Sequence, residues 1–308
     1  MRLLRFGTAV LASGLATGTA QAADSFIFAT EPTVEEASAV SGFIEGRYGS
    51  LGSSVGEEEA NAAAPDDDIV VDGGKWTLRG TVNARAGDFN VQVEAEFSAV
   101  DAGPYESSIG NGTIHAYYRP TGGSYAVGAF LRGGREDFLQ LSEIATERMD
   151  GVTDDLLIGS EVAFLSEHAT LHLRTGIGTR RDSPRGSDVG LDSDRLHIGA
   201  GANFYVGENL RFDLDGTYDR FENEQFQTDV DRFAIDGRAN YRFASAPVSV
   251  FAGYRYETRE IRSRLATEES ESNLNTLYAG ARLHFGTQTL KQEDRSGALW
   301  DTMDVMPR

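Results

Sequence analysis

The sequence predicts an all-β protein, a transmembrane antiparallel up-and-down β-barrel of about twelve strands. Three observations predict it. Apolar and polar residues alternate in runs of about ten residues, the pattern of a strand with one apolar face. These runs are joined in pairs by tight turns, and longer loops separate the pairs. No segment beyond the N-terminal region is long and uncharged enough to cross a membrane as a helix, which takes about 20 apolar residues.

The N-terminus has the pattern of an export signal. Arg2 and Arg5 precede an apolar run that ends near Leu15, and Ala20-Gln21-Ala22 fits the small-residue motif of signal peptidase sites. We therefore expect a cleaved signal peptide over 1–22. The remaining chain is divided into a periplasmic lead over 23–41, a barrel over 42–285 and a periplasmic extension over 286–308.

The composition excludes several classes of function. The net charge of -20 argues against a nucleic-acid partner, because phosphate binding needs a basic surface. The absence of cysteine excludes disulfides, thiolate metal sites and a cysteine nucleophile. No glycine-rich phosphate loop and no metal-binding motif is present, so we expect no cofactor and no metal site.

The expected strands are recognised one by one from their alternation. In the third, Phe89, Val91 and Val93 share one face, and Asn90 and Gln92 share the other. The twelve runs cover 42–51, 75–86, 89–99, 113–119, 124–132, 156–164, 169–177, 196–206, 210–218, 230–243, 248–257 and 275–285. Tight turns follow the even-numbered strands, at 86–88, 120–123, 166–168, 207–209 and 244–247. Loops follow the odd-numbered strands, over 52–73, 100–112, 133–153, 178–194, 220–229 and 258–273.

A soluble barrel has the same period-two alternation but turns its apolar face inward. The positions of the aromatic residues must therefore decide whether the apolar face of this barrel points outward or inward. Near the loop ends of the strands are Trp76, Phe97, Tyr218, Tyr254 and Tyr256. Near the turn ends are Phe89, Tyr118, Tyr125, Phe164, Phe204, Phe212, Tyr241, Phe243 and Phe285. The middles are aliphatic. Two aromatic girdles around an aliphatic band are typical of a lipid-facing surface.

The last strand, 275–285, resembles the terminal strand by which the barrel-assembly machinery recognises Gram-negative outer-membrane β-barrel proteins of the broad porin-like group. Tyr278, Gly280 and the final aromatic Phe285 are the residues of that assembly signal. The resemblance covers 42–285 and is one of pattern. It implies an outer-membrane location, periplasmic turns, and outer-membrane lipid, lipopolysaccharide and the assembly machinery as partners. In most of the group the chain stops at the aromatic residue, whereas here 286–308 follow.

The polar faces are expected to line a lumen. The candidate lumen-facing residues are Arg47, Arg79, Glu94, Glu96, Arg119, Arg174, Arg195, Arg211, Asp213, Arg238, Arg255 and Arg282. Opposed charges across a narrow lumen can filter small polar solutes. Alternatively, the same side chains pair with one another and fill the interior. About twelve strands lie between the filled small barrels and the open larger porins, so both interpretations stand.

The acidic loops and the histidines each allow more than one interpretation. The acidic loops, with Glu57–Glu59, Asp66–Asp68, Asp154–Asp155 and Glu268–Glu269, are most simply solvated segments. Hard cations take oxygen ligands, so weak divalent-cation binding is the alternative.

His172 and His197 are expected to point inward on neighbouring strands. No serine or carboxylate lies at a spacing from them that would indicate a catalytic site. We therefore expect wall residues and no enzyme.

The extension over 286–308 is too short for a folded domain. We expect it to be disordered, with a docking peptide as the alternative. The leading functional prediction is a porin-like channel for passive diffusion of small polar solutes or ions. A closed structural or surface-interaction barrel with acidic loops is the second, and a lipid-modifying enzyme is the third.

Overall fold

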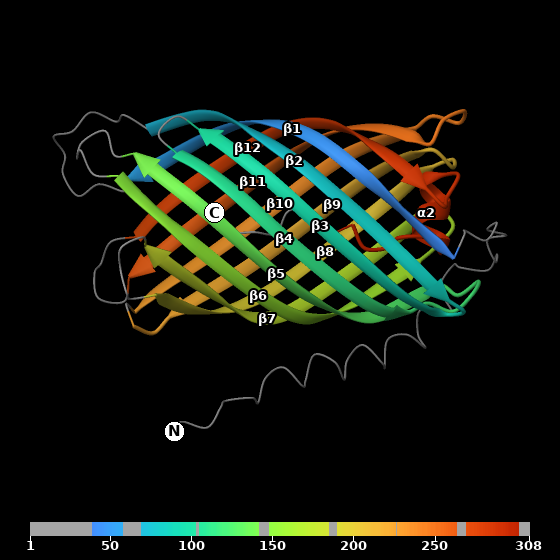
Figure 1. The fold of residues 1–308 in the computed structure, drawn as a ribbon, viewed down its shortest axis with the longest axis horizontal. Helices are drawn as coiled ribbons and strands as arrows, with labels where there is room; N and C mark the ends of the chain where they lie inside the picture. The colour runs from blue at the N-terminus through green and yellow to red at the C-terminus, as the bar shows by residue number, and fades with distance from the viewer. Residues whose placement is uncertain are drawn as a thin grey trace, which may run out of the picture. The chain divides into compact units, whose positions relative to one another are not determined.

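The structure is a computed structural model, and it describes residues 39–57, 69–102, 105–141, 148–184, 190–225, 227–263 and 269–301. These residues belong to one compact unit, a closed antiparallel barrel of twelve strands followed by one short helix (Figure 1). The expected signal peptide and nearly all of the expected lead lie outside the described residues. No helix in the described part of the chain is long and apolar enough to cross a membrane.

Each strand pairs with its neighbours in the sequence, and β1 pairs with β12 to close the barrel. The strands are β1 (Val40–Glu57), β2 (Ile69–Ala86), β3 (Phe89–Ala102), β4 (Tyr105–Tyr118), β5 (Tyr125–Leu141), β6 (Arg148–Leu165), β7 (Ala169–Pro184), β8 (Leu191–Val206), β9 (Leu210–Asn223), β10 (Thr228–Arg242), β11 (Val248–Ser263) and β12 (Glu269–Phe285). Closure leaves no strand edge without a hydrogen-bonding partner, as a membrane-spanning sheet requires. The prediction of a twelve-stranded all-β barrel is confirmed.

The strands continue well beyond the expected bounds, and the predicted loops are correspondingly shorter. The segment 100–112 is the clearest correction, because β3 runs to Ala102 and β4 begins at Tyr105. Asp154 and Asp155, expected in a loop, lie within β6. Beyond the lipid-facing band the outward positions are polar too, as at Glu106 of β4 and Arg135 of β5, so the alternation ends while the backbone ladder continues. The sequence pattern therefore marked the membrane-embedded part of each strand rather than its whole length.

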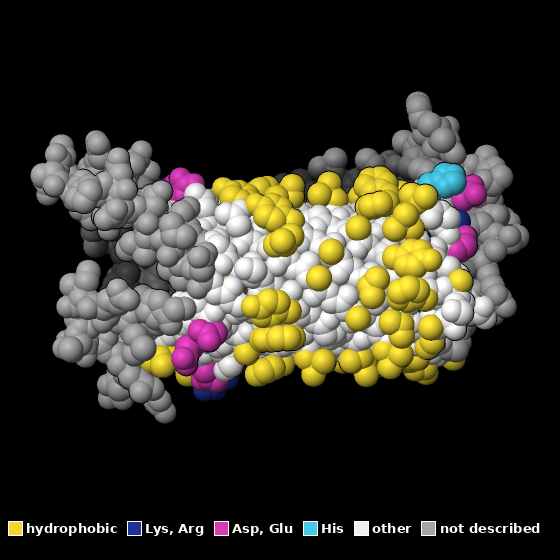
Figure 2. All heavy atoms as spheres, turned by 90° about the horizontal axis from the view of Figure 1, so that it is seen from above, with side chains coloured by type: hydrophobic (Ala, Val, Ile, Leu, Met, Phe, Trp, Pro, Cys, Tyr) yellow, Lys and Arg dark blue, Asp and Glu magenta, His cyan; other side chains and the backbone are white. Residues whose placement is uncertain are grey.

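The outer surface carries the apolar residues. Trp76, Leu78, Phe89 and Leu277 are among many large hydrophobic side chains that remain exposed on the barrel wall. On the face seen in Figure 2, hydrophobic side chains spread over the wall and charged side chains gather at its two ends. From Trp76 to Ala86 a strand advances roughly 34 Å along itself and, at a tilt of about 40°, roughly 26 Å along the barrel axis. This height matches the hydrocarbon band of an outer-membrane barrel, about 25 Å.

Aromatic pairs lie across neighbouring strands at both margins of this band. On the loop side, the rings of Tyr48 and Trp76 are 4.7 Å apart. On the turn side, the rings of Phe89 and Tyr118 are 5.4 Å apart in an edge-on arrangement. Such tilted pairs are the favoured geometry of neighbouring rings. Members of both predicted girdles therefore pack against an aromatic side chain of the neighbouring strand.

Residues 286–301, which we call the C-terminal plug, do not extend away from the barrel. Helix α2 (Leu290–Ser296) begins after the N-cap Thr289, whose side chain accepts a hydrogen bond from the Gln292 backbone at 3.0 Å. Lys291 Nζ lies 3.3 Å from Glu208 in the β8–β9 turn, so the helix lies at the turn end of the barrel. The expectation of a disordered extension is wrong for these residues, because the barrel interior supplies partners for their polar groups.

Candidate functional site in the barrel lumen

The interior of the barrel is built from polar and charged side chains. Of the candidate lumen-facing residues, all but Arg255 are buried, and the buried ones are Arg47, Arg79, Glu94, Glu96, Arg119, Arg174, Arg195, Arg211, Asp213, Arg238 and Arg282. Arg255 is half-buried, with its Nη2 atom 3.3 Å from Glu257. The alternation therefore places these side chains on the inner face of the wall.

This distribution is the reverse of that in a water-soluble barrel. Arg79 and Arg211 are 2% and 1% exposed, whereas Trp76 and Leu277 are 66% and 67% exposed. Water would favour the opposite arrangement, because charged side chains are almost never fully buried unless paired and large apolar side chains are normally inside. The chain is a transmembrane β-barrel. Its even strand number, with short turns at one end, places it in the architectural class of bacterial outer-membrane barrels.

The inward charges of this transmembrane barrel pair with charges on the next strand or on the next strand but one. Arg195 lies 2.6 Å from Asp155 and 2.7 Å from Asp219. Arg232 lies 2.6 Å from Glu257. Such charge-assisted contacts satisfy groups that would be costly to bury alone. Of the two interpretations of the lumen charges, the described structure therefore shows the paired one.

The plug enters this charged interior from the turn end, and a wall arginine fixes the end of its helix. Arg119 donates from Nη1 to the carbonyl of Asp294 and from Nη2 to the carbonyl of Gly297, both at 3.1 Å. These carbonyls lie at the C-terminal end of α2, where backbone acceptors lack helical partners and positive charge is favourable. A lumen-facing residue predicted from the sequence thus serves to hold the plug.

The two carboxylates of α2 are also bound to the wall. Glu293 Oε2 lies 2.5 Å from Nδ1 of His284. Burial raises the pKa of Glu293, but the charge of His284 and its hydrogen bond outweigh burial and leave this pKa below its ordinary value. Asp294 accepts hydrogen bonds from Asn203 at 2.8 Å, from Arg211 at 3.1 Å and from the Tyr205 hydroxyl. Both side chains are about 1% exposed, so the helix is anchored by buried polar contacts.

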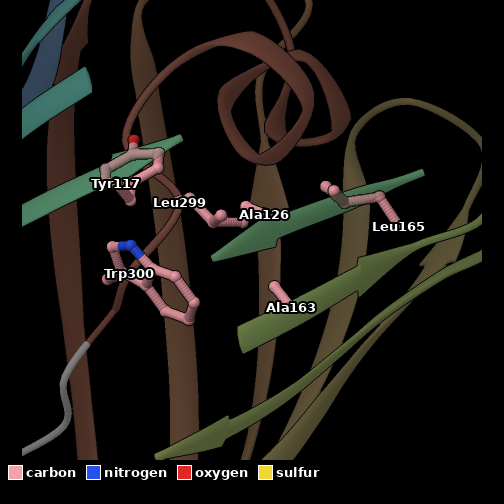
Figure 3. Close-up of a cluster of buried hydrophobic side chains, with 6 residues drawn as sticks. All are labelled: Tyr117, Ala126, Ala163, Leu165, Leu299 and Trp300. Atoms are coloured by element: carbon pink, nitrogen blue, oxygen red, sulfur yellow. The ribbon is translucent and has the colours of Figure 1, made fainter. Parts of the chain in front are cut away.

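After the helix, the plug contributes two large apolar residues to a small core inside the lumen. Leu299 and Trp300 pack with Tyr117, Ala126, Ala163 and Leu165 of the wall (Figure 3). The Trp300 ring stands edge-on to Tyr117, with centroids 5.8 Å apart, and stacks over His115 at 6.3 Å. The side-chain amide of Gln92 binds both backbone groups of Trp300, accepting from its N–H at 3.2 Å and donating to its carbonyl. Trp300 is therefore held by apolar and polar contacts together.

The plug reaches its deepest described contacts at Asp301. One carboxylate oxygen lies 2.5 Å from Arg79, and the other lies 2.5 Å from Arg238, 2.8 Å from Arg282 and 3.3 Å from Arg211. These arginines come from β2, β10, β12 and β9, so a single carboxylate joins four strands, of which only β9 and β10 are neighbours. Burial raises the pKa of Asp301, but the four guanidinium groups outweigh burial and hold this pKa well below its ordinary value.

The fold brings a serine, a histidine and a glutamate into a chain of hydrogen bonds. The sequence did not indicate this arrangement. Ser249 Oγ lies 2.8 Å from Nε2 of His284, whose Nδ1 contacts Glu293. This is the order of a hydrolytic triad. Ser249 is 0% exposed, however, so no substrate reaches its hydroxyl in this conformation. The chain of hydrogen bonds therefore acts here as an anchor for α2.

The histidines singled out in the sequence are likewise in contact with wall carboxylates. His172 Nε2 lies 2.7 Å from Asp215, and His197 Nδ1 lies 2.9 Å from Asp219. Within the described ranges, no group of three or more histidine and carboxylate side chains is arranged to hold a metal ion. The acidic runs at 58–59, 66–68 and 268 lie outside the described residues, so divalent-cation binding by these loops stays a prediction.

The residues of the predicted assembly signal occupy different sides of β12. Tyr278 points inward, and its hydroxyl donates to Asp236 at 2.6 Å. Gly280 lies opposite Arg47 in the β1–β12 seam. Phe285 faces outward at the turn end and is 38% exposed. The chain continues from Phe285 directly into the plug, so the last strand is also the element that delivers the plug to the lumen.

The sequence analysis gave a docked peptide only as the alternative to a disordered extension, although two signals for the plug were present. Thr289 followed three residues later by Gln292 is a helix-start pattern. Leu290, Leu299 and Trp300 are large apolar residues in a segment that was expected to be disordered. All three are buried. Together these features indicate a short helix followed by a docked segment.

Comparisons with known proteins found similarity in architecture alone. No protein family and no curated protein sequence matches the chain. Among solved structures, the translocator domain of the autotransporter NalP from Neisseria meningitidis has a TM-score of 0.47 at 12% identity, covering 90% of this chain and 97% of that one. The β-domain of the Bordetella autotransporter BrkA has a TM-score of 0.46 at 14% identity, covering 79% and 98%. The P. putida toluene transporter TodX has a TM-score of 0.43 at 9% identity, covering 82% and 91%.

Proposed function

We propose that this protein is an outer-membrane channel for small polar solutes whose lumen is closed, in the described conformation, by its own C-terminal plug. The observation that carries the proposal is the contact of Asp301 with four wall arginines. Through this contact the plug occupies the charged interior. The plug is joined covalently to the barrel only through β12 and is otherwise held by noncovalent contacts. A closed lumen of this kind opens when the segment leaves.

The lumen in the described conformation offers little room for a solute. A cavity of about 40 Å³ lies on the loop side of Asp301, with Arg47, Lys75, Arg232 and Tyr278 among its lining residues. A buried water needs roughly 10–15 Å³ by the same measure, so this cavity holds only a few waters. Passage of a solute through this region therefore requires the plug to move.

The wall is built so that it does not depend on the plug for its charge pairing. Arg282 also lies 2.5 Å from Glu45, Arg238 lies 2.8 Å from Asp213, and Arg79 lies 3.0 Å from Glu94. Removal of the plug would leave each of these arginines with a wall carboxylate and with water. The barrel can therefore persist with an open lumen, as a channel requires.

The second candidate function, a closed structural or surface-interaction barrel, is favoured by the loop end of the molecule. The strands extend past the apolar band there and present charged pairs to solvent, such as Arg135 with Asp137 and Asp154, both at 3.8 Å. These side chains are more than half exposed. In this alternative the plug is a permanent part of the fold and stabilises the barrel.

Single-channel conductance in a planar bilayer distinguishes the two candidates. The full chain is compared with Asp301→Arg, which places a fifth cation among the four arginines and should expel the plug. We expect brief or no openings in the parent and steady openings in the variant. Lys291→Gln is the matched control, because it alters the plug at a partly exposed ion pair with Glu208 at the turn end, and pairs at the surface are worth only about 0–1 kcal/mol.

Release of the plug is measured separately, by labelling with a membrane-impermeant maleimide. The chain has no cysteine, so Ser296→Cys introduces a single buried thiol in the plug. Ser245→Cys, in the exposed β10–β11 turn, reports the labelling rate of an accessible thiol. If Asp301→Arg labels like the exposed control and the bilayer still stays silent, the channel proposal is wrong and the closed barrel remains.

The remaining parts of this proposal concern location, assembly and chemistry. We propose that the barrel lies in an outer membrane with its turns and plug on the periplasmic side. The barrel-assembly machinery is its proposed partner during insertion and recognises β12. It is proposed to have no enzymatic activity, which is supported by the burial of Ser249 and by the ion pairs that engage its wall histidines. Conductance and vesicle insertion assays with purified assembly machinery test these points.

A further inference from the structure

We infer that Arg79, Arg211, Arg238 and Arg282 form a binding site for a phosphate-type oxyanion carried by a small solute, and that Asp301 of the plug occupies this site as an internal competitor. As an assignment of the transported solute, this inference rests on the proposed channel function. As a binding site, it stands on the geometry of the four side chains.

The number of donors exceeds what a carboxylate can accept well. Three guanidinium groups, those of Arg211, Arg238 and Arg282, converge on one oxygen of Asp301, while Arg79 contacts the other. A carboxylate offers two oxygens, whereas a phosphate offers three or four with a larger charge. A phosphate could spread the same four donors over separate oxygens.

Two further donors in the cluster have no acceptor. Among the described residues, Nη1 of Arg238 and Nη1 of Arg282 are buried and make no hydrogen bond. The former lies 3.9 Å from Glu45, beyond hydrogen-bonding distance. Both arginines are at most 3% exposed. Buried donors without partners are unfavourable, and an anion with more oxygens than Asp301 would satisfy them.

The local charge balance also favours an anion. The four arginines contact three wall carboxylates, which are Glu45, Glu94 and Asp213. The wall alone therefore leaves one positive charge over. The docked plug adds two carboxylates to the cluster, those of Asp301 and of Asp294, which lies 3.1 Å from Arg211. When the plug leaves, the same excess charge remains in a site walled by protein, where electrostatic interactions are stronger than in bulk water.

The side of the cluster opposite the plug holds a cavity. The cavity of about 40 Å³ is lined by Thr77 and Asp236, which are two residues nearer the loop end than Arg79 and Arg238 on the same strands. The cavity therefore borders the arginine cluster on its loop side. Because solute and Asp301 require the same donors, binding of one opposes binding of the other, and the solute promotes release of the plug.

Trp300 provides a direct readout, since it is adjacent to Asp301 and buried in the lumen. The full chain with Trp76→Phe has Trp300 as its only tryptophan. Inorganic phosphate is titrated against it in lipid vesicles, with chloride at equal ionic strength as the reference. We expect phosphate to shift the Trp300 emission toward that of a solvated indole, while chloride leaves it unchanged. Asp301→Asn should lower the phosphate midpoint by at least about tenfold, because it weakens the competitor.

Variants of the cluster separate a specific site from a general salt effect. Arg238→Gln should abolish the phosphate response, and if it does not fold, Arg238→Lys should weaken the response about tenfold, because lysine lacks the guanidinium fork. Arg135→Gln, at an exposed pair near the loop end, should leave the response unchanged. Equal responses to phosphate and chloride, or a response retained without Arg238, would overturn the inference. Phosphate binding in a barrel that never conducts would refute the channel proposal alone, and conduction without a phosphate response would refute this inference alone.

Discussion

Replacing Trp300 by alanine should release the C-terminal plug. Trp300 is 3% exposed, and its indole packs against Tyr117 and His115. A buried aromatic side chain covers about 150–250 Å², which at about 25 cal/mol per Å² corresponds to roughly 4–6 kcal/mol. Measured losses for Phe or Trp to Ala in cores are about 3–5 kcal/mol. We take roughly 4 kcal/mol for this site, which shifts the ratio of released to docked plug about a thousandfold.

The assay is maleimide labelling of Ser296→Cys, which is buried while the plug is docked. When docking equilibrates faster than labelling, the rate is proportional to the released population. We therefore expect Trp300→Ala to accelerate labelling by about two to three orders of magnitude, up to the rate of an exposed thiol.

The other tryptophan of the chain gives a matched control. Trp76 is 66% exposed on the outer wall and contacts Tyr48 rather than the plug. Trp76→Ala should leave the labelling rate of Ser296→Cys within about a factor of three of the parent, since surface changes are usually within about 0.5 kcal/mol. If Trp300→Ala accelerates labelling by less than about tenfold, the packing of Trp300 does not hold the plug and the reasoning is refuted.

Two further predictions concern pH and the membrane band. Because the pKa values of Asp301 and Glu293 are lowered in the docked state, their contribution to docking is complete above the ordinary carboxylate range and is lost as the pH falls through the lower docked values. The Trp300 emission of the Trp76→Phe protein should therefore stay constant from pH 7 to about 4 and change only below, and release between pH 7 and 5 would contradict this. Ile158→Arg, on the outer wall of β6, should destabilise the barrel by about 2–4 kcal/mol in urea unfolding from lipid vesicles. Thr258→Arg, near the loop end of β11, should change stability by less than about 1 kcal/mol, and equal losses would mean that the lipid band is misplaced.

The outward and inward faces of the wall could be read from the sequence because side-chain direction in a strand is a local property. Phe89, Val91 and Val93 alternate with Asn90 and Gln92, and the structure exposes the first three and buries the other two. The number of strands followed from the same pattern and from the tight turns between pairs. The full lengths of the strands did not follow, since the alternation stops where the strands leave the lipid.

The pairing of lumen charges was only partly accessible from the sequence. Arg195, Asp219 and Glu257 face inward because each occupies an inward position in the alternation of its strand. That Arg195 meets Asp155 and Asp219 depends on the register between β6, β7, β8 and β9, which closure of the whole barrel fixes. The alternation therefore supplied Arg195, whereas Asp155 was expected in a loop and Asp219 lay just beyond the expected strand. The longer strands and their register supplied these partners.

The sequence by itself determined that this chain forms a twelve-stranded barrel with lipid outside and charge inside, because period-two alternation acts over neighbouring residues. Only the tertiary structure decided that the C-terminal segment docks inside the barrel. Asp301 and Arg79 are 222 residues apart in the chain and meet because the barrel brings β2, β9, β10 and β12 around one point. Such a meeting depends on the circumference and stagger of the closed sheet and on the depth to which the plug inserts. No local pattern encodes those quantities, so the most specific contact of the protein is a property of the assembled barrel.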